Sequence, residues 1–175
     1  MTVTCGVGAV KLIIIRHAAA IDRDADIPDE RRYLTPAGRG YFRKTARTMR
    51  KQGVAPDLIL TSPLLRAVQT ADILAERLKY VGELMATDEL MPGFELADLE
   101  RLLATIGNAG EVCLVGHEPD LSLLVVTLLG LPQGFRFRKG NALRLDADPA
   151  KLRGSAAFKW LAAGKELIVS PAQAF

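Results

Sequence analysis

Residues that build metal centres and disulfide frameworks are scarce in this chain, which has two histidines and two cysteines among 175 residues. Cys5 and Cys113 form neither a metal-ligand spacing nor a disulfide framework, so we expect a reducing, cytoplasmic location and an inert packing role for Cys113. A metal site built from His17, His117 and Cys113 is disfavoured, because no Cys-x-x-Cys or His-x-x-x-His spacing exists. We expect no metal and no cofactor.

Long apolar runs and tracts of one charge are also missing. No stretch approaches the roughly 18 apolar residues that a membrane span requires. Residues 1–10 carry no charged n-region and no clear cleavage site, so we interpret them as a loose N-terminal extension. The net charge is only +3 and no Lys/Arg tail exists. We therefore expect a monomer with no membrane partner and no nucleic-acid partner.

A single domain over residues 11–175 is the predicted organisation, since the chain has no repeats and no linker. Short β-branched runs alternate with helical patterns, one of which begins at the cap-like pair Thr35 and Pro36. This alternation predicts an α/β protein with a mainly parallel central sheet that helices cover on both faces. Strands are expected over residues 11–16, 58–61, 83–85, 111–116, 141–146, 157–161 and 167–169, and helices over 36–52, 63–78, 96–106 and 119–129.

Both histidines come directly after strand-like apolar runs. His17 follows residues 11–16, and His117 follows residues 111–116. Neighbouring parallel strands end along one edge of a sheet, and ligands bind in the crevice at that edge. Two imidazoles delivered there can face the same small volume. Since imidazole is both a nucleophile and a proton carrier near neutral pH, the pair is the candidate catalytic centre.

Two arginines are expected at the same edge. Arg16 precedes His17, and Arg66 lies in the first turn of the helix that follows residues 58–61. The forked donors of arginine match phosphate oxygens two at a time, and helix N-termini add free N–H groups and partial positive charge. The expected guest of Arg16, Arg66 and both imidazoles is therefore a phosphoryl group.

Other polar residues near these positions have simpler interpretations. Ser62 has no glycine-flanked elbow around it, so we interpret it as a helix N-cap and not as a nucleophile. Arg31 and Arg32 lie in a polar loop and are interpreted as solvated. The alternative for the two arginines is contact with an acidic partner or with a second phosphate.

Several motifs together resemble the histidine phosphatase superfamily, which includes the phosphoglycerate mutases. The likeness runs from about Lys11 to Pro171 and is greatest to the SixA-type phosphohistidine phosphatases. It implies a phosphoglycerate mutase-like, three-layer α/β/α fold and a single histidine-phosphatase domain over residues 11–175. The motifs that carry it are Arg16-His17-Ala18, residues 34–38 (Leu-Thr-Pro-Ala-Gly), residues 62–71 (Ser-Pro-Leu-Leu-Arg-Ala-Val-Gln-Thr-Ala), residues 88–92 (Asp-Glu-Leu-Met-Pro) and Gly116-His117.

The resemblance implies a role for each site residue. His17 would be the nucleophile and would become a transient phosphohistidine, while Arg16 and Arg66 hold the phosphoryl oxygens and His117 stabilises their charge. Such chemistry needs positioning and charge stabilisation but no metal, and water completes the second step. The family usually has Gly after the nucleophile. If that position needed a positive φ, Ala18 would cost about 1 kcal/mol, and we expect a tolerated variation.

The proton donor has two candidates. Glu89 matches the family position, and Glu118 resembles the acidic neighbour used in another branch of the superfamily; we favour Glu89. A phosphoimidazole can be protonated in solution near neutral pH, so a weak acid suits an N–P substrate better than a sugar phosphate.

Short connections limit what can close over a substrate, since the longest loop before the first helix spans only residues 18–34. An open phosphate site suits a phosphohistidine carried on a phosphotransfer protein, in signal transduction. One alternative is a small-molecule phosphatase that acts on a sugar or nucleotide-related phosphate. The other is a catalytically silent phosphate-binding module.

Overall fold

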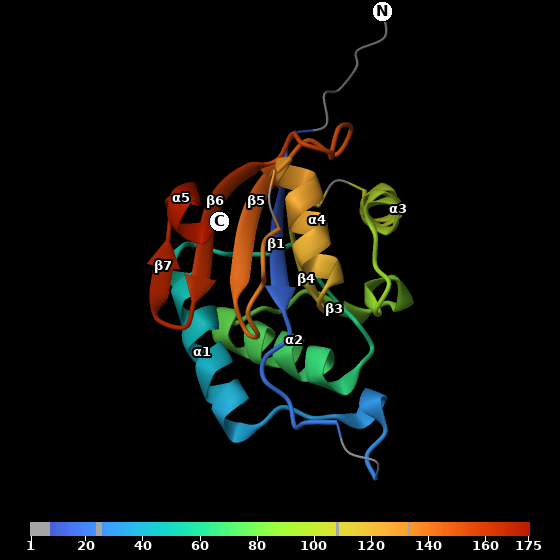
Figure 1. The fold of residues 1–175 in the computed structure, drawn as a ribbon, viewed down its shortest axis with the longest axis vertical. Helices are drawn as coiled ribbons and strands as arrows, with labels where there is room; N and C mark the ends of the chain where they lie inside the picture. The colour runs from blue at the N-terminus through green and yellow to red at the C-terminus, as the bar shows by residue number, and fades with distance from the viewer. Residues whose placement is uncertain (1–7, 24–25, 108, 133) are drawn as a thin grey trace, which may run out of the picture.

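Seven strands form one sheet in the order β3-β2-β4-β1-β5-β6-β7 (Figure 1). The computed structural model describes residues 8–23, 26–107, 109–132 and 134–175. Most of the predicted N-terminal extension, including Cys5, lies outside these described residues. The strands are β1 (Val10–Arg16), β2 (Leu58–Thr61), β3 (Glu83–Ala86), β4 (Glu111–Gly116), β5 (Ala142–Ala147), β6 (Ala157–Ala163) and β7 (Glu166–Ile168).

The sheet combines two pairing patterns. Strands β3, β2, β4 and β1 pair in parallel, whereas β5, β6 and β7 continue the sheet from β1 with antiparallel pairing. All four parallel strands therefore end at the same edge, as the sequence pattern predicts. The fold class is confirmed, with an antiparallel extension at the C-terminal side.

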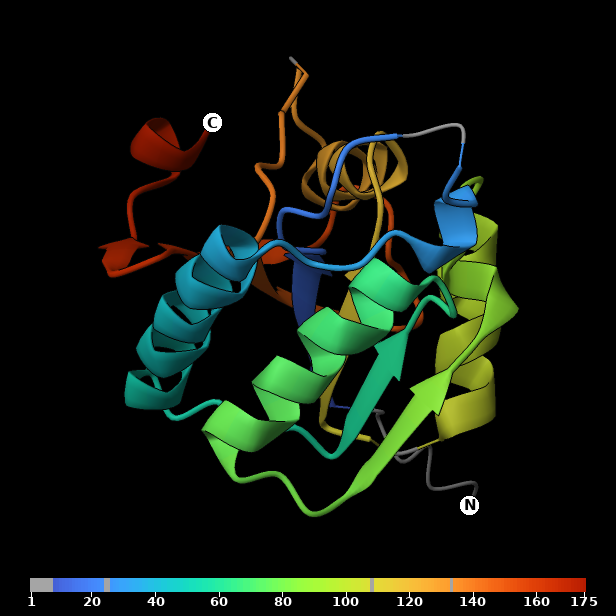
Figure 2. The same cartoon turned by 90° about the horizontal axis from the view of Figure 1, so that it is seen from below.

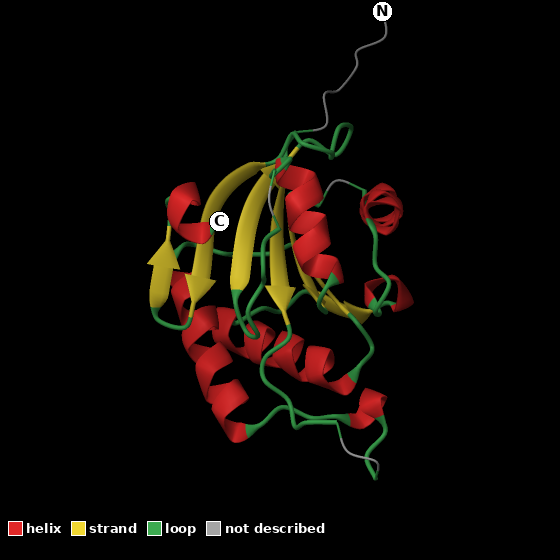
Figure 3. Ribbon diagram, viewed as in Figure 1, coloured by secondary structure: helices red, strands yellow, loops and turns green. Residues whose placement is uncertain are grey.

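Helices cover both faces of this sheet (Figures 2 and 3). Successive residues of β1 face opposite sides: Leu12 and Ile14 pack in the core under α3 and α4, and Ile13 and Ile15 in the core under α1 and α2. No helix among the described residues is long and apolar enough to span a membrane. The helices are η1 (Asp29–Arg31), α1 (Pro36–Lys51), α2 (Leu65–Leu78), η2 (Asp88–Leu90), α3 (Leu96–Ile106), α4 (Asp120–Leu129) and α5 (Pro171–Ala174).

The start of α1 is fixed close to the end of β1. The Thr35 hydroxyl accepts a hydrogen bond from the Gly38 amide at 3.0 Å, which confirms the predicted N-cap. A side chain at Gly38 would collide with the carbonyl oxygen of Ala19, so glycine allows the helix to approach this closely. The helix is thereby held against the segment that follows His17.

One predicted cap is wrong. The helix after β2 begins at Leu65, and its N-cap position is Leu64, not Ser62. The Ser62 amide still donates to the carbonyl of Val115 at 3.0 Å, which extends the β2–β4 ladder and delays the helix. The Ser62 hydroxyl accepts from the Leu64 amide at 3.3 Å and does not cap the helix. One predicted boundary near the N-terminus is also wrong, because Val10 belongs to β1 and not to the predicted extension.

Candidate active site

The two histidines meet where β1 and β4 end. Arg16 is paired with Gly116 in the parallel register, and the His17 amide donates to the Gly116 carbonyl at 3.1 Å. The His17 and His117 ring centroids are 5.1 Å apart, with the planes inclined at 53°. The strand register thus brings the two imidazoles together as predicted.

His17 presents one ring nitrogen to the site. Its Nδ1 lies 2.7 Å from the Ala18 carbonyl oxygen, which can only accept, so Nδ1 carries the proton and Nε2 keeps a free lone pair. Burial first, with the nearby His117, Arg66 and Arg16, lowers the pKa of His17 to about 3, although the hydrogen bond to Ala18 acts in the opposite direction. The imidazole is therefore neutral at physiological pH, as a nucleophile must be.

His117 presents a donor. Its Nε2 lies 2.8 Å from the Ser62 hydroxyl oxygen, and that oxygen also accepts from the Leu64 amide at 3.3 Å. When the Ser62 hydroxyl donates its hydrogen to Nε2, the ring proton resides on Nδ1 and can be donated to a ligand. Burial, followed by the charge of Arg66, lowers the pKa of His117 to about 4. Ser62 is a functional residue that the sequence did not indicate.

Both arginines are anchored by one part of the guanidinium and leave another part free. Arg66 donates from Nη1 to the Asp29 carbonyl at 2.8 Å and from Nη2 to the Asp29 carboxylate at 3.1 Å. Arg16 donates from Nη1 to the Phe137 carbonyl at 2.6 Å. In each the Nε is buried, and burial lowers the pKa of both side chains.

Unpartnered donors gather at this site. Within the described residues, four buried side-chain nitrogen or oxygen atoms lack a hydrogen-bond partner, and three of them are Arg16 Nε, Arg66 Nε and His117 Nδ1. These are the three residues predicted to bind the phosphoryl group. Since a buried donor without a partner is costly, these three nitrogens are candidates to donate to a bound anion.

Known proteins resemble this chain in sequence and in fold. A family model described as the histidine phosphatase superfamily (branch 1) matches residues 12–92. An uncharacterized protein of Picosynechococcus is 37% identical over 120 residues, which cover 64% of this chain and 68% of the relative. The chain belongs to the histidine phosphatase superfamily.

Solved structures of this superfamily share the fold. A protein histidine phosphatase SixA complexed with tungstate has a TM-score of 0.78 and 25% identity, over 89% of this histidine phosphatase and 97% of that chain. An alpha-ribazole phosphatase from Shigella flexneri has a TM-score of 0.63 and 18% identity, over 89% and 96% of the two chains. A mycobacterial glucosyl-3-phosphoglycerate phosphatase has a TM-score of 0.60 and 18% identity, over 90% and 100%. The last two likenesses concern the fold alone.

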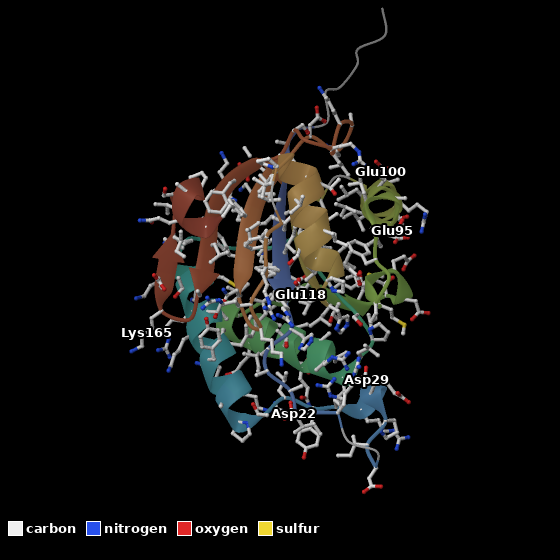
Figure 4. The ribbon with its side chains drawn as sticks, viewed as in Figure 1. Asp22, Asp29, Glu95, Glu100, Glu118 and Lys165 are labelled. Atoms are coloured by element: carbon white, nitrogen blue, oxygen red, sulfur yellow. The ribbon has the colours of Figure 1, made fainter. Side chains whose placement is uncertain are left out.

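Asp29 organises one side of this histidine phosphatase site, and sequence reasoning missed it (Figure 4). Besides Arg66, its carboxylate accepts from Arg32 Nη1 at 2.9 Å, while Arg32 Nε donates to the Ile21 carbonyl at 2.9 Å. These contacts, with the Arg32 bond first, lower the pKa of Asp29 to about 2. The prediction of a solvated Arg32 is therefore wrong, because the side chain ties its loop to Asp29. Arg31 is exposed, as predicted.

Ala18 occupies the usual glycine position without strain. Among the described non-glycine residues only Lys79 has a positive φ, so the expected cost at Ala18 does not arise. The Ala18 amide donates to the Thr70 hydroxyl at 3.1 Å, and this hydroxyl donates to the Arg66 carbonyl at 2.7 Å. Thr70 therefore links the nucleophile segment to the helix that carries Arg66.

Neither candidate proton donor contacts the imidazoles. Glu89 is exposed in η2, and a hydrogen bond from Thr87 lowers its pKa. Glu118 accepts from the Ser122 amide at 3.2 Å and from the Ser122 hydroxyl at 2.6 Å (Figure 4). Within the described residues, no hydrogen bond or ion pair joins either carboxylate to His17 or His117. Both acid roles stay predictions.

Cys113 lies inside β4 and is fully buried. Burial raises the pKa of its thiol well above the ordinary value, which keeps it protonated and supports the predicted packing role. In the part of the chain that the structure describes, no three His, Cys, Asp or Glu side chains are grouped to hold a metal ion.

Replacing Ser62 by alanine should lower kcat about 10-fold, because His117 Nε2 loses the partner that fixes its tautomer. Steady-state kinetics on p-nitrophenyl phosphate measure the loss. Thr61→Val is the matched control, since it removes a neighbouring buried hydroxyl that bonds the Ser62 carbonyl and does not contact His117. It should lower stability but not kcat. Full activity in Ser62→Ala would contradict the role given to Ser62.

Stability should fall as the pH is lowered from 7 to 5. The unfolded histidines take up protons near pH 6.5, whereas folded His17 and His117, with pKa values of about 3 and 4, stay neutral. The folded state is therefore fully favoured above pH 6.5 and loses about 2 kcal/mol per histidine by pH 5. Urea unfolding at several pH values measures this slope.

A variant without histidine is the control for this pH dependence of the unfolding free energy, because the chain contains no histidine besides His17 and His117. A His17→Gln, His117→Gln double variant should unfold with nearly the same free energy at pH 7 and pH 5. A wild-type slope as shallow as that of the double variant would show that the two rings are not held neutral.

Proposed function

We propose that the chain is a metal-independent phosphatase that removes phosphate from phosphohistidine on a phosphotransfer protein, through a phosphohistidine intermediate on His17. It would act as a cytoplasmic monomer in signal transduction, without a nucleic-acid or membrane partner. The observation that carries the proposal is the set of three unpartnered donors on Arg16, Arg66 and His117 beside a neutral His17.

The first step forms a bond from His17 Nε2 to phosphorus and breaks the bond from phosphorus to the leaving group. Arg16 Nε, Arg66 Nε and His117 Nδ1 donate to the phosphoryl oxygens, whose charge they stabilise in the transition state. A bound dianion also offsets the repulsion between the guanidinium groups of Arg16 and Arg66. In the second step water attacks phosphorus, the bond to Nε2 breaks, and inorganic phosphate leaves with His17 restored.

The weak supply of protons at the site favours an imidazole leaving group. The lowered pKa of Glu89 keeps that carboxyl ionised at neutral pH, and Glu118 accepts two hydrogen bonds from Ser122. An alkoxide leaving group needs a proton donor in the transition state, whereas imidazole takes a proton from solvent near neutral pH. The similarity to a SixA protein histidine phosphatase points the same way.

A small-molecule phosphomonoesterase is the second candidate. Structures with the same fold include alpha-ribazole and glucosyl-3-phosphoglycerate phosphatases, so the fold accommodates such substrates in other members. Phosphohistidine remains the favoured substrate.

A substrate panel tests the proposal. Turnover of p-nitrophenyl phosphate without added metal separates an enzyme from a silent phosphate-binding module. A histidine-phosphorylated phosphotransfer domain is then compared with sugar and nucleotide phosphates under the same conditions. The proposal requires kcat/KM to be highest on the phosphorylated domain, and a preference for a sugar or nucleotide phosphate would refute it.

A further inference from the structure

A short basic segment lies beside the phosphate site. Arg136, Arg138 and Lys139 are all exposed and form what we term the basic rim. None of them makes an ion pair with a described carboxylate, although eight such pairs occur elsewhere in the described chain. The charge of Arg136 repels that of Arg16, so an anionic partner would stabilise this arrangement.

The basic rim is attached rigidly to the reaction centre. Phe137, between its two arginines, is fully buried; its carbonyl accepts from Arg16 and its amide donates to the Ser122 hydroxyl at 2.9 Å. The Gly140 amide lies 3.1 Å from the carbonyl oxygens of both Arg16 and His17. Its φ of 74° favours glycine. A molecule bound on the basic rim is therefore held at a fixed distance from the nucleophile.

A groove of about 560 Å³ continues from the basic rim along the antiparallel side of the sheet. Its wall is fixed by a 2.8 Å hydrogen bond from the Tyr41 hydroxyl to the Asn141 side chain. The Phe137 carbonyl, between Arg136 and Arg138, accepts from Arg16, which places the start of the groove close to the phosphate site. The groove is lined in part by Tyr41, Arg136, Arg138, Asn141, Glu166 and Phe175.

We propose that the basic rim and this groove dock an acidic surface of the protein that carries the phosphohistidine. This inference rests on the function proposed above. The phosphoryl site itself holds only the phosphoryl group, so the body of a protein substrate must lie on the surface around it. Charge complementarity there increases the association rate and orients the phosphorylated histidine toward His17.

Other polyanions fit this surface less well. An anionic membrane is bound by a helix with an exposed apolar face, whereas Phe42, Ala46 and Met49 of α1, next to the groove, are buried against the sheet. Single-stranded nucleic acid needs aromatic rings with open faces, whereas in the groove Phe135 and Phe175 pack against each other, with ring centroids 5.0 Å apart. An acidic protein surface requires neither.

Two substrates with the same reacting bond test the docking surface. One is free phosphohistidine, and the other is an acidic, histidine-phosphorylated phosphotransfer domain. The variant is Arg136→Gln with Arg138→Gln. Its matched control is Lys151→Gln with Arg153→Gln, which removes the same charge from exposed residues between β5 and β6, at the opposite end of the sheet.

The rim variant should lose about 10-fold in kcat/KM on the phosphorylated domain and much less on free phosphohistidine. The control should match the wild type on both, and the wild-type rate on the domain should fall more steeply with salt than that of the rim variant. Equal losses on the two substrates, or no loss on the domain, would overturn the docking surface alone. Variant-sensitive binding to duplex DNA or anionic vesicles, with unchanged turnover of the domain, would also overturn it.

Failure of the proposed function would look different. Wild-type protein that hydrolyses p-nitrophenyl phosphate but not the phosphorylated domain would refute protein phosphohistidine as the substrate, and the docking surface with it. Wild-type protein that hydrolyses the domain, with a rim variant that does so equally well, would leave the proposed function intact.

Discussion

His17→Ala is expected to lower kcat by about 10⁴-fold or more, because no other nucleophile replaces Nε2 opposite the phosphoryl group. The expectation follows from the free lone pair on Nε2, which the hydrogen bond from Nδ1 to Ala18 leaves facing the site. Stopped assays on p-nitrophenyl phosphate and on free phosphohistidine should show the same loss.

Folding should survive this change. The His17 ring lies in the site beside His117 and makes a single side-chain hydrogen bond within the described chain. Circular dichroism and a thermal melt of His17→Ala should therefore resemble those of the wild type. A folded variant that keeps a substantial fraction of the wild-type kcat would refute the role of His17 as the nucleophile.

Arg66→Lys is expected to lower kcat about 100- to 1000-fold, although the charge is conserved. Nη1 and Nη2 of Arg66 donate hydrogen bonds to Asp29, and its buried Nε has no partner. A lysine ammonium is a single point donor on a flexible stem, so it cannot hold Asp29 and a phosphoryl oxygen in this fixed geometry.

Arg77→Lys is the matched control for that substitution. Arg77 lies near the far end of the same helix, α2, also has a buried Nε without a partner, and pairs with Glu76 at 3.3 Å. Its replacement should leave kcat unchanged. If Arg66→Lys behaved like Arg77→Lys, the bidentate anchoring on Asp29 would have no catalytic value.

The residues at the strand ends could be predicted because apolar runs in the sequence mark where each strand ends. The apolar runs that end at Arg16 and Gly116 are strands by length and composition, and parallel strands in register end together. His17 and His117 follow those runs directly, so their meeting required only the correct fold class. Arg66 followed from the same rule applied to β2.

Contacts that come from loops could not be predicted in this way. Asp29 lies in a stretch without hydrophobic period, and nothing in the chain marks it over other loop carboxylates until η1 is placed against α2. The sequence around Ser62 matches a helix cap, which is why its role could not be predicted. In the structure the Ser62 amide adds one more hydrogen bond between β2 and β4, and its hydroxyl contacts His117. The carbonyl of Phe137 as an anchor for Arg16 is likewise a property of the folded chain.

Trapping the phosphohistidine intermediate is the direct test of His17 as the nucleophile. Wild-type protein mixed with a slowly hydrolysed phosphodonor is quenched under alkaline conditions and examined by mass spectrometry and phosphorus NMR. We expect one phosphoryl group on His17, attached to Nε2, because Nδ1 donates to the Ala18 carbonyl. Phosphate on Nδ1, on His117 or on any other residue would contradict it.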